Sequence, residues 1–339
     1  MKMTRTRKRG MRRRTRGAGV VLAAALCFGF VSMSWAATHY VVRSNPGALY
    51  PYTSWATAAT NIQAAIGAAA YGETILVSNG AYSAGGVALY GAMTNRVALT
   101  NGVIVRSVNG PGITSIRGQG PNGNGAVRCA YVATNCLLSG FTLRLGATLT
   151  NGDTYAGQSA GGVLCENGGV VSNCVIEGNS ASRYGGGAID GTLYQCTLAS
   201  NSAWEGGGVF RSDLYRCTLA SNSADYSGGG MYFGALYNCL VFSNSAAANG
   251  GGVSWATLYN CTLVGNAAAR GGGVYQSALL NGIAYYNTAP DGANYESNST
   301  LSFCCTTPMP TNGAGNITNA PQFVSAAARD YRLTLSSPC

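Results

Sequence analysis

The chain is poor in charged residues and almost free of histidine. Asp, Glu, Lys and Arg together make up 9% of its 339 residues, and His39 is its one histidine. Histidine is the usual base of Ser/His/Asp and Cys/His catalysis and a frequent zinc ligand. Because His39 lies close to the N-terminus, the sequence excludes these catalytic sites and histidine-based metal sites from the main body of the chain.

Lysine is also absent beyond the first residues. Residues 1–16 hold nine of the 21 Lys and Arg residues and no acidic residue, which leaves 12 basic against 11 acidic residues in the remainder. The net charge of +10 therefore belongs to the N-terminal segment, and the rest of the chain is near +1. Since nucleic-acid binding needs a basic surface, the sequence predicts no nucleic-acid partner.

The N-terminus has the layout of an export signal. The basic residues 1–16 precede an apolar run of small residues at 17–33, and Ser34 and Ala36 stand at −3 and −1 of a possible cleavage before Ala37. The pattern predicts a signal peptide over residues 1–36, a secreted or cell-surface location, and no membrane span in the mature chain. An uncleaved N-terminal anchor is the alternative.

Cysteine recurs with a fixed period. Five cysteines are 22, 21, 22 and 22 residues apart, each in the frame apolar-x-x-Cys-x-apolar-x-x-Asn, and a glycine triplet marks the same phase in each unit. The cysteines are Cys174, Cys196, Cys217, Cys239 and Cys261, and the asparagines are Asn179, Asn201, Asn222, Asn244 and Asn266. Chance does not keep this phase over five units, so the chain is a repeat protein.

The glycine triplets decide between two repeat architectures. Leucine-rich repeats share the frame but need a helix or another return segment, and three glycines cost about 2–3 kcal/mol in a helix relative to alanine. The short runs between turns instead predict an all-β, single-stranded right-handed parallel β-helix. It would have about ten coils of 21–22 residues, stacked about 4.8 Å apart, and a short N-terminal capping helix.

The repeat predicts ladders of identical side chains. Cysteine and leucine two positions apart in a strand would point into a dry core, and each asparagine would bond the backbone and the asparagine of the next coil. The five stacked cysteines are interpreted as buried thiols, because they cannot all pair among themselves. Cys304, Cys305, Cys129, Cys136 and Cys339 are the better disulfide candidates, with their connectivity left open.

The segments outside the repeat predict caps. Residues 37–72 would form an N-terminal cap, in which a helix from Ser54 to Gly72 carries Ala59, Ile62, Ala65 and Ile66 on one face. The β-helix would span 73–290, with residues 146–160 inserted as an exposed loop over one flank. Residues 291–339 would form a last coil and a C-terminal cap, and we expect this sequence to be truncated there.

Several segments together resemble a known superfamily. "NIQAAIGAAAYGETILV", "LSGFTLRLG", the Asn and triple-glycine repeats and the ending "PQFV…DYRLTLSSPC" are similar to secreted bacterial right-handed β-helix proteins of the pectate-lyase-like superfamily. "GGAI" at 186–189 also resembles polymorphic outer-membrane protein repeats. The resemblance implies polysaccharide lyases and hydrolases among the relatives, and also noncatalytic surface proteins.

Columns of side chains counted from each repeat cysteine supply the candidate sites. Asp190 and Arg211 occupy one column with Asp213 nearby, and these three are the candidate catalytic residues, although no full catalytic set is evident. Trp204, Glu205, Asp225 and Tyr226 form a rim that we expect to contact glycans. A third column consists of stacked tyrosines that could instead serve only to stabilise neighbouring strands: Tyr194, Tyr215, Tyr237 and Tyr259.

The sequence thus predicts an exported, monomeric surface or extracellular β-helix protein, structural or binding in role, adhesin-like or glycan-contacting. It predicts no metal site and no cofactor, with a polysaccharide or cell-surface glycan as partner. The alternative is a polysaccharide lyase or hydrolase acting on a uronate-type polymer, where only the lyase would need Ca²⁺. The alternative requires acidic residues to converge on one flank, and the candidates are Asp153, Glu166, Glu177, Asp190 and Asp213.

Overall fold

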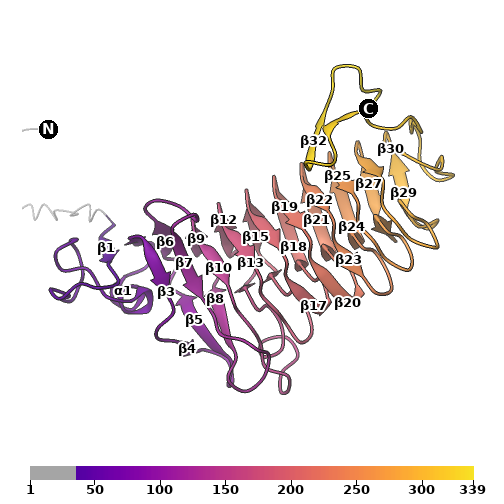
Figure 1. Cartoon of the computed structure of the whole chain (residues 1–339). Coiled ribbons are helices and arrows are strands. Elements are labelled where there is room, and N and C mark those ends of the chain that lie inside the picture. Colours follow the sequence, from indigo (N-terminus) through magenta and orange to yellow (C-terminus); the bar gives the residue numbers. More distant parts are fainter. Residues whose placement is uncertain (1–35) are drawn as a thin grey trace, which may run out of the picture. The chain divides into compact units, whose positions relative to one another are not determined.

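The computed structural model describes residues 36–339, so the predicted signal peptide lies almost entirely outside the described residues. The described part of the chain begins with strand β1 (Thr38–Val41) and helix α1 (Ile62–Ala68), which lie at one end of the solenoid (Figure 1). Ile62, Ala65 and Ile66 form the buried face of α1. In the part of the chain that the structure describes, no helix is both long enough and apolar enough to cross a membrane.

The predicted bounds of the helix were wrong. The side chain of Asn61 caps α1 by accepting from the backbone N–H of Ala64 at 2.8 Å, and the helix ends at Ala68, with Ala69 as its C-cap, rather than at Gly72. Ser54 instead bonds Thr57 in a separate turn. Ala59 lies before the helix, in a β-bridge to Val41. The helix is shorter because Asn61 provides an N-cap immediately before the apolar face.

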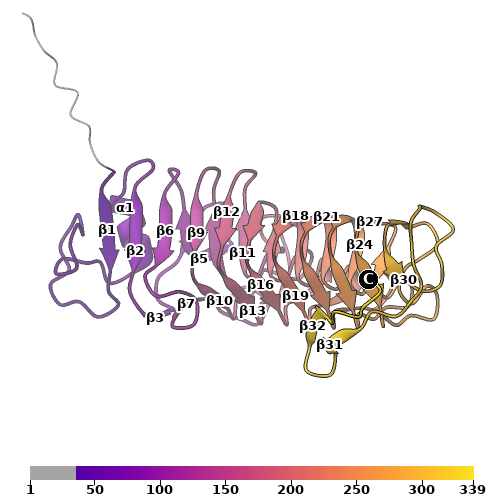
Figure 2. The same ribbon diagram turned by 90° about the horizontal axis from the view of Figure 1, so that it is seen from above.

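The coils of the solenoid build two long sheets, and three of the coils add a strand to a third, shorter sheet (Figures 1 and 2). The first sheet contains two ladders of strands. Within one coil the chain passes first through a strand of one ladder and then through a strand of the other, so we name them the upstream and the downstream ladder. In three coils one long strand, β18, β21 or β24, serves both ladders. The upstream ladder contains β5 (Thr94–Leu99), β8 (Val127–Val132), β11 (Val163–Cys165), β14 (Ala188–Ile189), β18 (Val209–Tyr215), β21 (Met231–Tyr237), β24 (Val253–Tyr259) and β26 (Val274–Tyr275), with β4 (Val87–Ala88) antiparallel to β5.

The downstream ladder runs from β1 to the last coil. It contains β2 (Thr74–Val77), β6 (Ile104–Ser107), β9 (Leu137–Ser139), β12 (Val170–Ser172), β15 (Thr192–Tyr194), the second halves of β18, β21 and β24, β27 (Ala278–Leu280) and β29 (Thr300–Ser302). Both ladders are parallel, so the same position of successive coils lies in one row.

The second sheet contributes one strand per coil. Its ten strands are β3 (Gly80–Tyr82), β7 (Thr114–Arg117), β10 (Thr142–Arg144), β13 (Val175–Glu177), β16 (Thr197–Ala199), β19 (Thr218–Ala220), β22 (Leu240–Phe242), β25 (Thr262–Val264), β28 (Ile283–Tyr285) and β30 (Cys305–Thr306). The third sheet is shorter and contains β17 (Ser202–Glu205), β20 (Ser223–Ser227) and β23 (Ser245–Ala246). The fold is therefore a right-handed parallel β-helix, as predicted.

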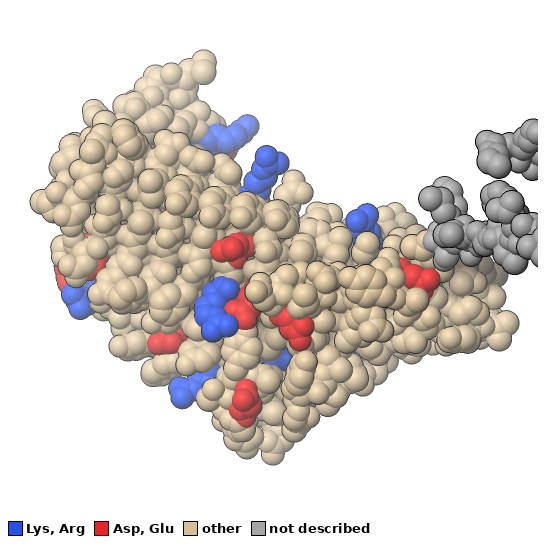
Figure 3. Space-filling model, turned by 180° about the vertical axis from the view of Figure 1, so that it is seen from behind, with Lys and Arg blue, Asp and Glu red and all other residues tan. Residues whose placement is uncertain are grey.

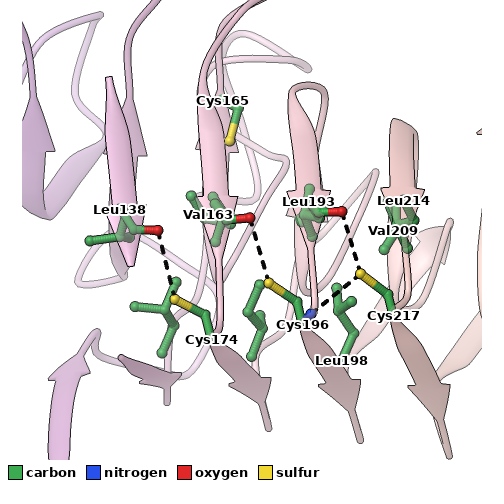
Figure 4. Packing of buried hydrophobic residues seen from close by; sticks show 14 of the residues in the cluster. Leu138, Val163, Cys165, Cys174, Leu193, Cys196, Leu198, Val209, Leu214 and Cys217 are labelled. Atoms are coloured by element: carbon green, nitrogen blue, oxygen red, sulfur yellow. Dashed lines mark hydrogen bonds between the residues drawn. The ribbon is translucent and has the colours of Figure 1, made fainter. Parts of the chain in front are cut away.

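The repeat cysteines lie inside the solenoid but not within strands. Cys196 occupies the corner between β15 and β16, and its backbone N–H donates to the sulfur of Cys217 at 3.4 Å (Figure 4). The strand position predicted for the cysteines was wrong, because Gln195 before the corner has a positive φ that ends the strand. The cysteine side chain still points inward beside Leu193 and Leu198.

The asparagines close the opposite corner. The amide of Asn201 donates to the carbonyl of Ile176 at 2.8 Å and to the side-chain oxygen of Asn222 at 3.0 Å. The same two bonds recur in the neighbouring coils, and the chain of amides continues to Asn287 and Asn294. Every polar atom of the buried Asn201 amide therefore has a partner at the corner, which keeps its burial from being costly.

The C-terminal segment packs on the side of the solenoid. Strands β31 (Phe323–Ser325) and β32 (Asp330–Leu333) form an antiparallel hairpin over the second sheet, where Tyr331 contacts Phe242 with ring centroids 5.5 Å apart (Figure 2). A disulfide joins Cys305 to Cys339 and ties this segment to the last coil. Cys129, Cys136 and Cys304 are free and buried, so they form no bridge.

The insertion at residues 146–160 is not the exposed loop that the sequence predicts. Only its tip at 150–154 is exposed, whereas Ala147, Thr148, Ser159 and Ala160 are fully buried. The reason is a second apolar cluster on the outer face of the upstream ladder, which the loop covers.

Candidate functional site

The outer face of the upstream ladder is apolar rather than solvated. Tyr131, Leu164, Ile189 and Phe210 follow one another in register on β8, β11, β14 and β18 and are all buried. Tyr155 of the inserted loop packs against this row. A strand at the surface normally exposes every second side chain to solvent. An apolar outer row must therefore be covered by another segment, and the inserted loop covers part of this row.

A cavity of about 360 Å³ lies where this cover ends. Its polar lining comes from two acidic residues, three tyrosines and a buried arginine, and Met93 and Leu164 are among its apolar members. The polar and aromatic members are Tyr90, Tyr131, Tyr155, Glu166, Asp190 and Arg128, with Asn95 and Asn167 beside them.

Glu166 is held by four donors. Its carboxylate accepts from the hydroxyls of Tyr131 and Tyr90, the latter at 3.3 Å, and from the backbone N–H and hydroxyl of Thr134, both at 3.1 Å. These bonds, led by that of Tyr131, lower the pKa of Glu166. The carboxylate is therefore ionised at neutral pH.

Tyr131 is held as a neutral donor. Burial, together with its bond to the ionised Glu166, raises the pKa of the Tyr131 hydroxyl well above its usual range. A tyrosine in this state donates a hydrogen bond but does not act as a base at neutral pH.

Asp190 forms the second anionic centre of the cavity. Its carboxylate accepts from the hydroxyl of Tyr155 and makes a bidentate pair with Arg211, at 3.0 and 3.1 Å. The guanidinium of Arg211 also lies 5.4 Å from the ring centre of Tyr155. Asp190 is therefore held in one position by a side chain of the next coil and by one of the inserted loop.

A second cavity of about 310 Å³ adjoins the first, and Asn167 and Asp190 line both. Thr192, Arg211 and Asp213 complete its polar lining. The structure thus brings the three candidate catalytic residues together. We call the two cavities, from Tyr90 to Asp213, the groove.

An exposed aromatic row continues from the groove along the solenoid. Asp190, Arg211, Phe233 and Trp255 occupy the same position of successive coils, between the upstream and downstream ladders, and all have positive φ. The ring centres of Phe233 and Trp255 are 6.2 Å apart, and both side chains are exposed. The bend at this position turns each side chain outward.

Arg128 supports the groove from beneath. It is fully buried and donates to the carbonyls of Ala156, Ser159 and Ala160 and to the side-chain oxygen of Asn95, all within 2.8 Å. Burial lowers the pKa of Arg128 to about 10, so it remains charged at neutral pH. Its bonds fix the inserted loop over the outer face of the ladder.

The predicted glycan rim lies elsewhere. Trp204 and Glu205 on β17, and Asp225 and Tyr226 on β20, belong to the third sheet. The rings of Trp204 and Tyr226 are parallel within 3° at 5.7 Å, and both are close to half exposed. They form a flat platform that lines neither cavity of the groove.

The other predicted columns and acidic residues are separate from the groove. The tyrosine column stacks on the outer face of the downstream ladder, with centroid distances of 5.0, 4.7 and 5.2 Å. Asp153 accepts from the backbone of its own loop, and Glu177 lies on β13 of the second sheet. Within residues 36–339 no three His, Cys, Asp or Glu side chains are grouped to hold a metal ion.

Sequence reasoning missed Tyr90, Tyr131, Tyr155 and Arg128 as site residues. They lie in coils or loops before the regular repeat, where no period indicates which side chains share a face. The one usable signal was the insertion itself, since long ordered loops often carry function.

Comparison with solved structures identifies the fold. A pectate lyase structure superposes with a TM-score of 0.59 and 14% sequence identity, covering 91% of each chain. The chain has the pectate-lyase-like right-handed β-helix fold. At this identity the match concerns the fold alone.

Two further solved structures are similar at lower scores. The A-module of an Azotobacter vinelandii mannuronan C-5 epimerase has a TM-score of 0.39 and 18% identity, covering 71% of this chain and 76% of that one. A rhamnogalacturonan lyase has a TM-score of 0.45 and 11% identity, covering 83% of this chain and 85% of that one. No protein-family model matches the chain, and no curated protein matches it either.

Proposed function

We propose that this protein is exported and binds a polysaccharide along the groove of the first sheet. The observation that supports this most directly is the arrangement of the groove: tyrosine rings, fixed carboxylates and an arginine line two adjoining cavities, and Phe233 and Trp255 extend the row. Because coils repeat about every 4.8 Å, a linear polymer along the axis meets an equivalent position at every coil.

The chemistry of the groove suits a sugar chain. Aromatic side chains offer flat apolar faces, and the Asp190 carboxylate, which has three donors, can accept one further hydrogen bond from a sugar hydroxyl. Glu166 and Asp190 are already held in place by Tyr131, Tyr155 and Arg211, so little side-chain freedom would be lost on binding. The fold similarity to a pectate lyase is consistent with such a ligand.

The test compares the groove with the platform of the third sheet. Binding to a panel of neutral and acidic polysaccharides would be measured by calorimetry for the full chain and for two double variants. The first variant combines Tyr90→Ala with Trp255→Ala, and the second combines Trp204→Ala with Tyr226→Ala. We expect the first pair to weaken binding about tenfold or more, and the second to leave it unchanged. The reverse result would assign the ligand to the platform and refute the proposal.

A second candidate function is cleavage of the bound polymer. The observation that favours it is that Glu166 and Asp190 line the same cavity, as paired carboxylates do in glycosidases. Against it stands the lowered pKa of Glu166, which keeps this group from serving as a proton donor at neutral pH. Release of reducing ends or of unsaturated ends, with and without Ca²⁺, would support cleavage, and Glu166→Gln should abolish it.

Export and a surface location are part of the proposal. They rest on the basic and apolar segments before Ala37. N-terminal sequencing of protein recovered from culture medium or from the cell surface should begin at Ala37. Recovery of the uncut chain from the membrane fraction would instead favour an N-terminal anchor.

A further inference from the structure

A second charged site lies on a different sheet from the groove. Arg117, Arg144 and Glu177 end the neighbouring strands β7, β10 and β13, which lie side by side in the second sheet (Figure 2). The register pairs Arg144 with Arg117 on one side and with Glu177 on the other. The three charges thus form one row on the outer face of the solenoid, in its N-terminal coils.

The two arginines lack partners. The Nε atom of each is buried and has no hydrogen-bond partner, and among the described residues neither guanidinium is within ion-pair distance of Glu177. Like charges at directly opposite positions of adjacent strands are destabilising, and a buried N–H without an acceptor adds to that cost. The three side chains together therefore have a net charge of +1, and the two guanidinium groups have N–H donors without protein acceptors.

The two arginines of the N-terminal coils whose side chains are buried, Arg96 and Arg128, have protein acceptors. Arg128 makes four hydrogen bonds, and Arg96 donates to the carbonyls of Arg117 and Gly85. The fold can thus supply acceptors to a buried guanidinium. On the outer face of the second sheet, Arg117 and Arg144 have no such protein acceptor. This difference from Arg96 and Arg128 favours an acceptor that belongs to a ligand.

The row faces a cavity of about 480 Å³. Ser115 and Thr142, two residues before the arginines on the same strands, line its floor, and the segment Pro111–Ile113 forms a wall. Ile113 is more than half exposed, so this wall presents apolar surface. Thr142 already donates to the carbonyl of Pro111 at 2.8 Å, which holds the wall in place.

We propose that Arg117 and Arg144 bind a singly charged oxyanion group, a carboxylate or a sulfate ester, carried on an organic body that contacts Pro111 and Ile113. Two adjacent guanidinium groups suit an acceptor with several oxygens, and guanidinium groups bind oxyanions with good geometry. Glu177 closes the far end of the row and disfavours ligands with further negative charge there. The site lies on the second sheet, so it is independent of the groove.

The test uses four probes that separate the charge from the sugar body. Glucuronic acid and glucose 6-sulfate carry the charge on a sugar body, glucose lacks the charge, and inorganic sulfate lacks the body. Calorimetry or NMR titration of the full chain should show saturable binding of at least one charged sugar, weaker binding of sulfate and none of glucose. A carboxylate and a sulfate ester are distinguished by which charged sugar binds more tightly.

Variants make the assignment specific. Arg117→Gln and Arg144→Gln should each weaken binding of the charged sugar about tenfold or more, and Glu177→Gln should strengthen it. Arg216→Gln, at an exposed arginine elsewhere, serves as the matched control and should change nothing. Circular dichroism confirms that each variant is folded.

Two results would overturn the proposal. One is the absence of saturable binding of both charged sugars by the folded protein. The other is binding that survives unchanged in the folded Arg117→Gln, Arg144→Gln double variant. Because Glu166→Gln alters the groove alone, it should leave this binding intact, so failure of the groove proposal and failure of this one are distinguishable.

Discussion

At the scale of single residues, buried amides and carboxylates hold the coils together through defined partners. Asn222 is fully buried; its amide donates to the carbonyl of Leu198 and to Asn244, and its oxygen accepts from the backbone N–H and the amide of Asn201. In the groove, Glu166 has the comparable role of accepting from side chains of other coils. Each such residue connects its own coil to neighbouring coils.

Replacing Asn222 should destabilise the solenoid more than a surface change in the same coil. Asn222→Ala leaves buried donors and a carbonyl without partners, and we expect a loss of about 3 kcal/mol in the free energy of unfolding. Ser223→Ala, at the exposed neighbouring position, should cost under about 0.5 kcal/mol. Urea unfolding followed by circular dichroism measures both, and equal costs would argue against a structural role for the amide chain.

Glu166 should make stability depend on pH. Its pKa is lowered in the folded chain from 4.5, chiefly by the Tyr131 hydroxyl, so its contribution is fully present above about pH 4.5 and is lost as the pH falls through the folded value. We expect Glu166→Gln to flatten the decline of the melting temperature as the pH falls below about 4.5.

Some acid sensitivity should remain in that variant. The pKa of Glu73 is also lowered, mainly by its hydrogen bond with His39, and this pair lies in the N-terminal cap far from the groove along the chain. The double variant with Glu73→Gln should be flatter still. A Glu166→Gln profile that is parallel to the parent's would show that Glu166 gains nothing from its partners.

At the scale of structural elements, the glycine triplets form the corner that returns each coil to the upstream ladder. The first glycine of a triplet has a positive φ, as at Gly206. The middle glycine has a different requirement, because a side chain at Gly207 would collide with the carbonyl of Ser223 in the next coil. The triplets are thus needed both for the turn and for the close approach of neighbouring coils.

A pair of alanine substitutions separates these two requirements. Gly178→Ala places a side chain at positive φ in open space, and we expect a cost of about 1 kcal/mol. Gly207→Ala requires the backbones of two neighbouring coils to move apart, and it should lower the free energy of unfolding by about 3 kcal/mol or more. Chemical unfolding of both variants gives the comparison. A Gly207→Ala protein as stable as Gly178→Ala would mean that the coils separate easily.

At the scale of the whole molecule, one continuous core runs through the interior of the solenoid. The core contains the repeat cysteines together with inward leucines and valines from every coil, and no described coil packs its interior residues separately. Burial raises the pKa of the Cys129 and Cys165 thiols to about 12, so they remain protonated. Buried, protonated thiols are poor nucleophiles.

The cysteines therefore report on opening of the core. We expect none of the nine free thiols between residues 36 and 339 to react quickly with an aromatic disulfide reagent in the native protein, and all nine to react in guanidinium chloride. The disulfide between Cys305 and Cys339 is the internal control, since it contributes thiols only after reduction. Fast reaction of one or two thiols in the native protein would show that individual coils open independently.

Much of this architecture could be predicted from the repeat, but the groove could not. The spacing of Cys196 and Asn201 identified the interior and one corner, because a fixed period repeats the same environment in every coil. The groove depends on Tyr90, Tyr131 and Glu166, which lie in coils of irregular length. Which of these residues lie side by side depends on the register between neighbouring strands, and no local sequence pattern shows that register.

The repeat alone was enough to predict the coil, its apolar interior, the amide-lined corner and the glycine turn. Each of these follows from one period and from local chemistry: small residues where the chain turns sharply, and apolar residues where it faces inward. Which outward residues share a surface is known only from the tertiary structure. It placed Glu166 and Asp190 in one cavity, separated both from Trp204, and left Arg117 beside Arg144 without an acceptor. Stacking places residues one coil apart next to each other. Where the coils differ in length, this separation varies along the chain, so the neighbouring pairs are known only once the backbone is folded.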